Sequence, residues 1–337
     1  MDDLVRHMGE HAVSKMAISK IERGLIRPSA ATLQAIADAC HQPLAYFFQP
    51  SLNLGAFEYR FKAEVTERQR QEVKAMISDL LQRYFEMQPL EGDISPFVHP
   101  MRGTTLRNYA DAEAAALKLR RKWEIGLQPI HSVYELLACY GFHVLEIDLG
   151  CQNIDGLSSF VNGTIPIIII NTSANTTTER KRFTALHELC HLLFRLRPDD
   201  EVRHQAYLAS LPPLPYTVTL KQPDVERLCN LFASAMLMPQ PCVLRRFGSA
   251  RTQVDAEEFK LTRRLYGNSV AAQIHRLHDL RIIDDRLYSH LYQTIIDEDR
   301  MEKNLGTPYP IMEMADAPTL LSARIKAELE GVDGELD

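Results

Sequence analysis

One pentapeptide constrains the fold of this 337-residue chain more than any other feature: His187-Glu188-Leu189-Cys190-His191. Residues four apart lie on the same face of a helix, one turn from each other. On a helix, the two imidazoles can therefore reach a single metal ion at about 2.0–2.1 Å. Glu188 is placed to contact a water molecule beside that ion, so it suits a general base better than a ligand. The pattern predicts a helix that presents a metal centre.

The flanking residues favour such a helix. Thr176-Thr177-Thr178-Glu179 is a capping-box sequence and predicts a helix from about 177 to 196. Most of its surface is apolar, which predicts burial and a low dielectric around a bound cation: Phe183, Leu186, Leu189, Leu192, Leu193 and Phe194. The alternative is that the pentapeptide contains two hydrogen-bonded core histidines and a surface glutamate.

A hydrolytic zinc site needs three protein ligands and one open position. No third histidine follows at short spacing, so we expect a carboxylate from a second helix, and Glu226 is the best candidate. Asn230 lies on the same helical face as Glu226 and could orient a metal ligand without itself binding the metal. Weaker candidates are Asp199, Asp200 and Asp224. The residue that stabilises an oxyanion is not identified, although His204, Tyr207 and Tyr216 lie between the two helices in sequence.

The remaining pattern predicts a mostly helical α+β protein with a small, mainly antiparallel sheet. Strands are expected near 142–147, 157–161 and 165–170, and Asn162-Gly163 is a hairpin signal between the last two. Further helices are expected near 64–87, 109–123, 131–140 and 224–237. The helix at 64–87 has an apolar stripe, which either packs within its own domain or forms a homodimer seam.

The first 50 residues read as short helices, with Ser29 as the cap of the third. Residues 14–28 contain Lys15, Lys20, Arg23 and Arg27 against one acid, Glu22, a local net charge of +3. That charge is enough to contact several phosphates of a DNA duplex.

Composition and charge divide the chain into four parts. We predict a helical domain at 1–50, a linker with a long helix at 51–105, a metal-binding domain with C-terminal helices at 106–300, and an acidic tail at 301–337. Residues 297–337 hold 11 acids and 4 bases, whereas the whole chain has a net charge of −6, so the rest sums to about +1. A global basic excess is therefore excluded, and the acidic end is expected to be solvated.

The composition also bears on location. The longest apolar run, 165–170, is far shorter than the roughly 18 residues that a membrane span needs, and no secretory signal is visible. The six cysteines form no CxxC pair, which favours reduced thiols in the cytoplasm.

Two sequence blocks resemble the ImmA/IrrE-type metallo-endopeptidases. Residues 182–193 are similar to the family signature RFTLAHELGHLLL, and residues 226–239 to its second block, E-x-x-(A/C)-N-x-F-A-A-x-x-L-M-P. The resemblance covers roughly residues 110–310. It implies a minimal zincin-like domain in which His187, His191 and Glu226 bind zinc and Glu188 is the base. Cys190 replaces the usual glycine, and we expect it to fill the core.

Residues 17–37 resemble an XRE/Cro-type helix-turn-helix, with a recognition helix at about 15–23. The resemblance implies DNA contact by six residues: Ser14, Lys15, Ser19, Lys20, Arg23 and Arg27. The family's unit has a further helix before the equivalent of Leu4, so the resemblance also implies either a misassigned start codon or a truncated domain with impaired DNA binding. The alternative is a helical packing module that does not contact DNA. Residues 263–277 also have the residue spacing of a helix-turn-helix, but in the resembled family this region belongs to the peptidase half.

These observations predict a cytoplasmic zinc endopeptidase and transcriptional regulator. Its expected substrate is a helix-turn-helix repressor of a stress or mobile-element response, lying extended along the edge of strand 165–170. The alternative is a DNA-binding regulator whose zincin-like domain senses a ligand without proteolysis. The glutamate next to the first histidine favours the enzyme, because a sensor needs no base.

Overall fold

The structure is a computed structural model that describes residues 2–22, 25–48, 58–61, 67–87, 97–150, 153–173, 176–194, 197–198, 219–220, 222–298 and 313. The chain divides into two compact units, Met1–Ser51 and Leu52–Asp337.

The N-terminal unit is a small helical bundle. Its elements are α1 (Asp2–His7), η1 (Gly9–His11), α2 (Lys15–Glu22), α3 (Ala30–Ala39) and η2 (Leu44–Phe48). Met8, Ile18, Ala35 and Ile36 form its core. Ser29 caps α3 as predicted, because its Oγ accepts a hydrogen bond from the N–H of Thr32 at 3.1 Å.

The second unit is built on a four-stranded sheet. Its strands are β1 (Glu58–Phe61), β2 (His143–Ile147), β3 (Ile154–Val161) and β4 (Ile165–Asn171), in the order β1-β3-β4-β2. The pairs β1–β3 and β3–β4 are antiparallel, and β2–β4 is parallel. The expected fold class, mostly helical with a small and mainly antiparallel sheet, is confirmed.

The hairpin between β3 and β4 also matches the prediction. Asn162 and Gly163 have φ of 51° and 73°, the left-handed region that an Asn-Gly turn adopts readily. The N–H of Thr164 donates to the carbonyl of Val161 at 3.2 Å and closes the turn.

Two features of the sheet differ from the sequence prediction. β1 lies within the segment that we expected to be a linker, and it pairs with β3. In addition, β4 is an interior strand, hydrogen-bonded to β3 on one side and β2 on the other. The expectation that a substrate would pair along the edge of 165–170 is therefore wrong, because that strand has no free edge.

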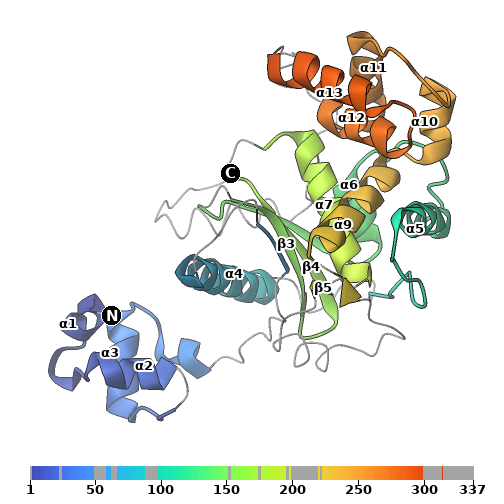
Figure 1. Ribbon diagram of the computed structural model, residues 1–337. Coiled ribbons are helices and arrows are strands. Elements are labelled where there is room, and N and C mark those ends of the chain that lie inside the picture. Colours follow the sequence, from blue (N-terminus) through green and yellow to red (C-terminus); the bar gives the residue numbers. More distant parts are fainter. Residues whose placement is uncertain are drawn as a thin grey trace, which may run out of the picture. The chain divides into compact units, whose positions relative to one another are not determined.

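Helices cover both faces of the sheet (Figure 1). Helix α4 (Glu67–Met87) packs on one face through Val73, Ile77, Leu81 and Tyr84. This is the apolar stripe that could have formed a dimer seam, and it is buried within the chain. The other face is covered by helices that share one core with Ile168 and Ile170: α5 (Tyr109–Lys122), α6 (Val133–Cys139), α7 (Thr178–Phe194) and α9 (Gln222–Leu237). The run of isoleucines in β4 is thus buried on both faces.

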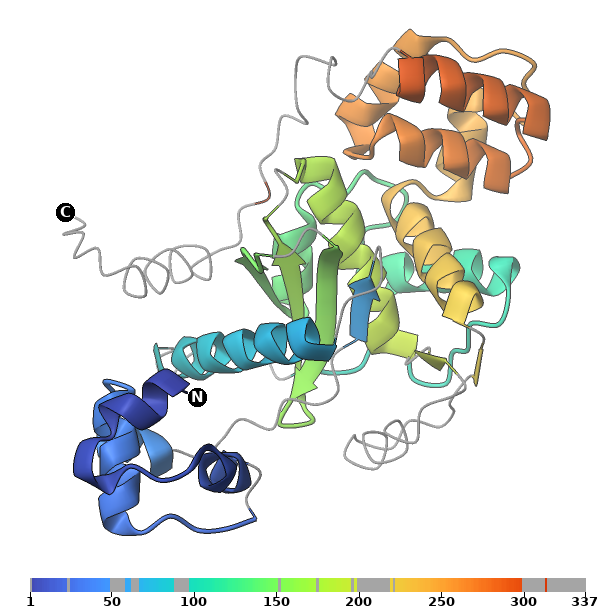
Figure 2. The same ribbon diagram turned by 60° about the vertical axis from the view of Figure 1, so that its left-hand side comes forward.

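The last described helices form a third core. They are α10 (Gln240–Phe247), α11 (Ala256–Tyr266), α12 (Val270–Asp279), α13 (Asp285–Leu291) and η3 (Tyr292–Glu298), drawn in orange and red in Figures 1 and 2. Residues 263–277 span α11 and α12, where Arg263 and Arg276 are buried in ion pairs with Glu179 and Glu113. These two buried arginines therefore stabilise the fold through ion pairs and do not form a DNA-binding surface. A short parallel pair, β5 (Arg197–Pro198) and β6 (Thr219–Leu220), completes the described elements. None of the described helices combines the length and apolarity of a membrane span.

Glu313 departs from the expectation of a solvated acidic tail. Its carboxylate is buried and accepts hydrogen bonds from Ser132 Oγ at 2.8 Å and from the N–H groups of Val133 and Tyr134 at 3.0 Å each. It also pairs with the fully buried Arg182 of α7. The reason is local charge, because a buried guanidinium and two free amides at the start of α6 stabilise an anion there. The other residues of the predicted tail lie outside the described part of the chain.

Candidate metal centre

Helix α7 places His187, Glu188 and His191 in the interior of the second unit, where all three are buried. Thr177 begins the helix by accepting a hydrogen bond from the N–H of Arg180 at 3.3 Å. The cap is therefore Thr177, one residue later than the Thr176 of the predicted capping box, and the side chain of Glu179 pairs with Arg263 at 2.7 Å.

Three side chains converge on one point. His187 Nε2 lies 3.2 Å from His191 Nε2 and 3.2 Å from Glu226 Oε2, and His191 Nε2 lies 3.5 Å from Glu226 Oε1. A tetrahedral ion with ligands at 2.0–2.1 Å would hold its donors about 3.3 Å apart. The three side chains are therefore spaced as zinc requires.

The charges at this point favour an anionic carboxylate. Burial opposes ionisation of Glu226, but hydrogen bonds with His187 and His191 outweigh it and hold the pKa of the carboxyl well below its ordinary value. Burial lowers the pKa of His191, whereas Cys229, Glu226 and Glu188 raise it more strongly. The site thus concentrates negative potential around two imidazoles, as a cation site does.

Two polar contacts hold these groups in position. Asn230 Oδ1 lies 3.0 Å from His187 Nδ1, which leaves Nε2 facing Glu226. Ser158 of β3 donates from Oγ to Glu188 Oε2 at 2.8 Å. Gly156 permits this close approach of strand and helix, because a Cβ there would lie 2.5 Å from Thr184 Cγ2. The sequence prediction included Asn230 but missed Ser158, whose contact depends on pairing of distant segments.

Cys229 is a second candidate for the third ligand. Its thiol, together with His187 and His191, belongs to a buried group whose ligand atoms lie within 4.8 Å of one another. Burial raises the pKa of the Cys229 thiol, and hydrogen bonding to Cys190 raises it further. Glu226 faces both Nε2 atoms and its side chain is 28% exposed, which leaves access for a water and a substrate. The geometry therefore favours Glu226.

Several other predicted residues fall outside the description. Cys190 is fully buried, in agreement with its expected place in the core. The side chains of the alternative ligands and oxyanion candidates lie outside the described residues: Asp199, Asp200, His204, Tyr207, Tyr216 and Asp224.

A cavity of about 590 Å³ lies between α7, α9 and α12. Asn230, which contacts His187, lines it together with Phe183, His275, Tyr288 and Tyr292. The rings of Tyr288 and Tyr292 lie 5.4 and 5.6 Å from that of His275, so the cavity has an aromatic wall. Such a wall can accommodate an apolar side chain.

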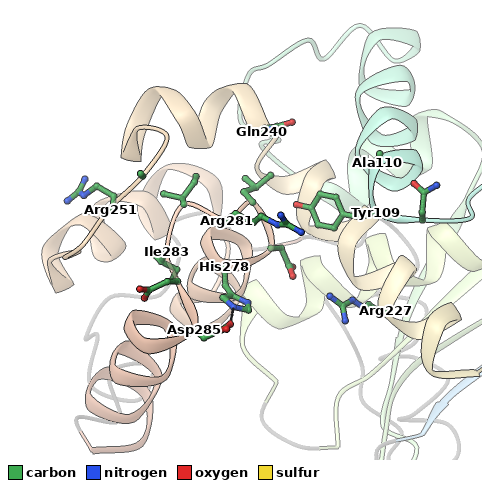
Figure 3. Close-up of a pocket in the computed structure, with 15 residues that line it drawn as sticks. Tyr109, Ala110, Arg227, Gln240, Arg251, His278, Arg281, Ile283 and Asp285 are labelled. Atoms are coloured by element: carbon green, nitrogen blue, oxygen red, sulfur yellow. Dashed lines mark hydrogen bonds and ion pairs between the residues drawn. The ribbon is translucent and has the colours of Figure 1, made fainter.

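A larger cavity, of about 1060 Å³, lies away from the histidine pair. Figure 3 shows Tyr109 of α5, Arg227 of α9, and Arg281 and His278 among its lining residues. His278 pairs with Asp285 at 2.7 Å. Arg227 lines both cavities and directly follows Glu226 in sequence.

In the N-terminal unit, the proposed DNA-facing residues lie on or near α2. Lys15, Lys20 and Arg27 are exposed, and Ser19 is half-buried. Ser14 is exposed and also caps α2, since its Oγ accepts from the N–H of Ala17 at 3.2 Å. Arg23 lies outside the described residues.

Comparison with known proteins gives two family matches. Residues 7–47 match the helix-turn-helix family, and residues 137–278 match the IrrE N-terminal-like domain, peptidase family M78. A curated relative, the radiation response metalloprotease IrrE of Deinococcus radiodurans, is 36% identical over 85 residues. That match spans 24% of this chain and 23% of the relative's length.

Proposed function

We propose that this chain, in which residues 7–47 match the helix-turn-helix family and residues 137–278 match the IrrE N-terminal-like domain, is a cytoplasmic zinc-dependent endopeptidase that also binds DNA. The observation that carries the proposal is the triangle of His187, His191 and Glu226 donors, with Glu188 beside it. The exposed Lys15 and Lys20 of α2 support the DNA contact.

We assign the ligands as His187, His191 and Glu226. A bound zinc ion would supply a Lewis acid that lowers the pKa of a water and polarises the scissile carbonyl. Glu188 accepts the proton of the attacking water at its carboxylate and delivers it to the leaving amine. Ser158 fixes that carboxylate through the 2.8 Å hydrogen bond to Oε2, and Asn230 fixes the His187 ring.

We propose a protein substrate, a helix-turn-helix repressor whose cleavage releases stress or mobile-element genes. The support is the helix-turn-helix match in the same chain and the name of the curated relative, a radiation response metalloprotease. The aromatic wall of the cavity that Asn230 lines favours a substrate with a large apolar side chain.

A second candidate function is ligand sensing without proteolysis. The observation that favours it is the cavity of about 1060 Å³ shown in Figure 3, which lies apart from the histidine pair and is large enough for a small molecule.

The test of the proposed enzyme combines metal analysis with peptide cleavage. Purified wild-type protein should contain about one zinc per chain and should cut members of a proteome-derived peptide library, identified by mass spectrometry. His191→Ala should lose both properties. Full zinc occupancy in His191→Ala would contradict the ligand assignment, whereas a zinc-loaded wild type that cuts nothing would favour the sensor.

A further inference from the structure

The sheet presents one strand to the proposed catalytic base. Strand β3 packs against α7, and its Ser158 holds Glu188 at 2.8 Å. One edge of β3 is paired with β4. An extended peptide that adds to the opposite edge would run past the base, and strand addition of this kind uses backbone hydrogen bonds alone for its affinity. The outer edge of β3 is therefore the surface that a peptide substrate needs.

That edge is already occupied by a segment of the same chain. β1 pairs with β3 in the antiparallel sense, with Glu58 opposite Ser158, Tyr59 opposite Leu157 and Phe61 opposite Ile154. Figure 2 shows β1 as a blue arrow at the border of the green sheet. Glu58 is level with Ser158, the residue that contacts the base. The pairing slips between Tyr59 and Phe61, which makes this contact less regular than the β3–β4 pairing.

The position of β1 in the sequence keeps this strand close to the edge of β3. β1 follows the end of the N-terminal unit at Ser51 and precedes α4, which is anchored in the sheet's core. A strand tethered so closely has an effective concentration in the millimolar range or above, so it competes strongly with a free peptide.

We propose that β1 is an intramolecular ligand of the peptide-binding edge of β3, and that a protein substrate binds only when β1 leaves. A strand near the start of the second unit thus masks the substrate site in cis. This inference rests on the proposed peptidase function, because it takes the β3 edge as the place where a substrate pairs.

The test removes the pairing and spares the side-chain chemistry of the centre. Successive N–H groups of a strand point to opposite edges, so one of Tyr59 and Arg60 directs its N–H toward β3. Tyr59→Pro with Arg60→Pro removes that donor whichever residue carries it. The matched control is Tyr59→Ala with Arg60→Ala, which changes the same side chains and keeps both N–H groups.

The first readout is binding, measured in a Glu188→Gln background so that nothing is cut. The probe is a synthetic decapeptide with the sequence of residues 54–63, titrated by calorimetry. We expect the double-proline variant to bind it at least about tenfold more tightly than the double-alanine control, because the tethered competitor is lost. Equal affinity in the two variants, or no binding to either, would overturn the proposal.

The second readout is hydrogen exchange of residues 154–161, measured first in the wild type and then in the double-proline variant. In the wild type, the amides on the outer edge of β3 should be protected. They should exchange faster in the double-proline variant and regain protection when the decapeptide is added. Unprotected outer-edge amides in the wild type would overturn the proposal even if the double-proline variant failed to fold.

Cleavage separates this inference from the proposed function. With Glu188 intact and zinc bound, the double-proline variant should cut the peptide library faster than the control. If it binds the decapeptide tightly but neither protein cuts any peptide, β1 still masks a peptide site and the peptidase assignment fails. If both proteins cut the library at the same rate and bind the decapeptide equally, the peptidase assignment holds and the masking by β1 fails.

Discussion

Replacing Glu313 should destabilise the second unit far more than a single carboxylate in an acidic segment ordinarily could. The carboxylate serves Ser132 Oγ, the N–H groups of Val133 and Tyr134, and the guanidinium of Arg182. The exposed fractions of the Arg182 and Glu313 side chains are 0% and 1%. Glu313→Ala therefore leaves a buried guanidinium without its counter-charge.

Breaking a buried ion pair by removing one partner costs about 3–5 kcal/mol. The carbonyls of Ile130 and His131, which accept hydrogen bonds from Arg182 at 2.7 and 2.8 Å, remain and soften the loss. We therefore expect the lower half of that range, about 3–4 kcal/mol, which corresponds to a fall in Tm of roughly 6–10 °C for a unit of this size. Glu313→Gln keeps the shape of the side chain and should cost less than Glu313→Ala.

The assay is chemical denaturation followed by a probe of the second unit, with thermal unfolding as a check. The charge-matched control is Glu257→Ala, which breaks an ion pair with Lys260 whose carboxylate is 68% exposed, and should cost less than about 1 kcal/mol. A Glu313→Ala protein as stable as the Glu257→Ala protein would refute the reasoning, since it would mean that Glu313 does not pair with Arg182 in solution.

Three further outcomes are expected. His187→Ala should abolish zinc binding. Asn230→Ala should weaken zinc binding by about 10–100-fold, because the His187 ring loses the contact that orients it. Competition with a chelator measures both affinities, and an unchanged affinity in either variant would contradict the ligand assignment. Duplex DNA binding should weaken as salt rises, and Lys20→Ala with Arg27→Ala should reduce the slope of log K against log salt by about 2; an unchanged slope would remove α2 from the interface. Burial lowers the pKa of His143, so the folded state favours the neutral ring. The stability that this ring contributes is therefore present above the unfolded pKa of about 6.5 and is lost as the pH falls below that value. His143→Gln should therefore lose less stability than the wild type between pH 7.5 and 5.5 in denaturation curves, and parallel losses would exclude this residue.

The sequence was sufficient for the elements whose signals are local. The HExxH spacing on an apolar helix placed His187 and His191, and the Asn-Gly turn placed the hairpin of β3 and β4. Glu226 could be predicted as a ligand because it lies on a second predicted helix, on the same helical face as Asn230.

The features that the sequence could not provide depend on contacts between distant segments. No local pattern marks Glu58–Phe61 as a strand, since the described strand with which it pairs is β3, about 100 residues later in the chain. The same holds for Ser158, whose role depends on the packing of β3 against α7. Glu313 sits in an acidic stretch that reads as solvated, and only the folded position of Arg182 distinguishes it from its neighbours.

The most direct test of the central claim is the Glu188→Gln variant. The substitution preserves the size of the side chain and all three proposed ligands, but it removes the carboxylate that accepts the proton of the attacking water. Zinc content, measured by elemental analysis, should stay near that of the wild type, while cleavage of library peptides should fall by about 10²–10⁴-fold. Cleavage that persists at the wild-type rate in a zinc-loaded Glu188→Gln protein would contradict the proposed mechanism.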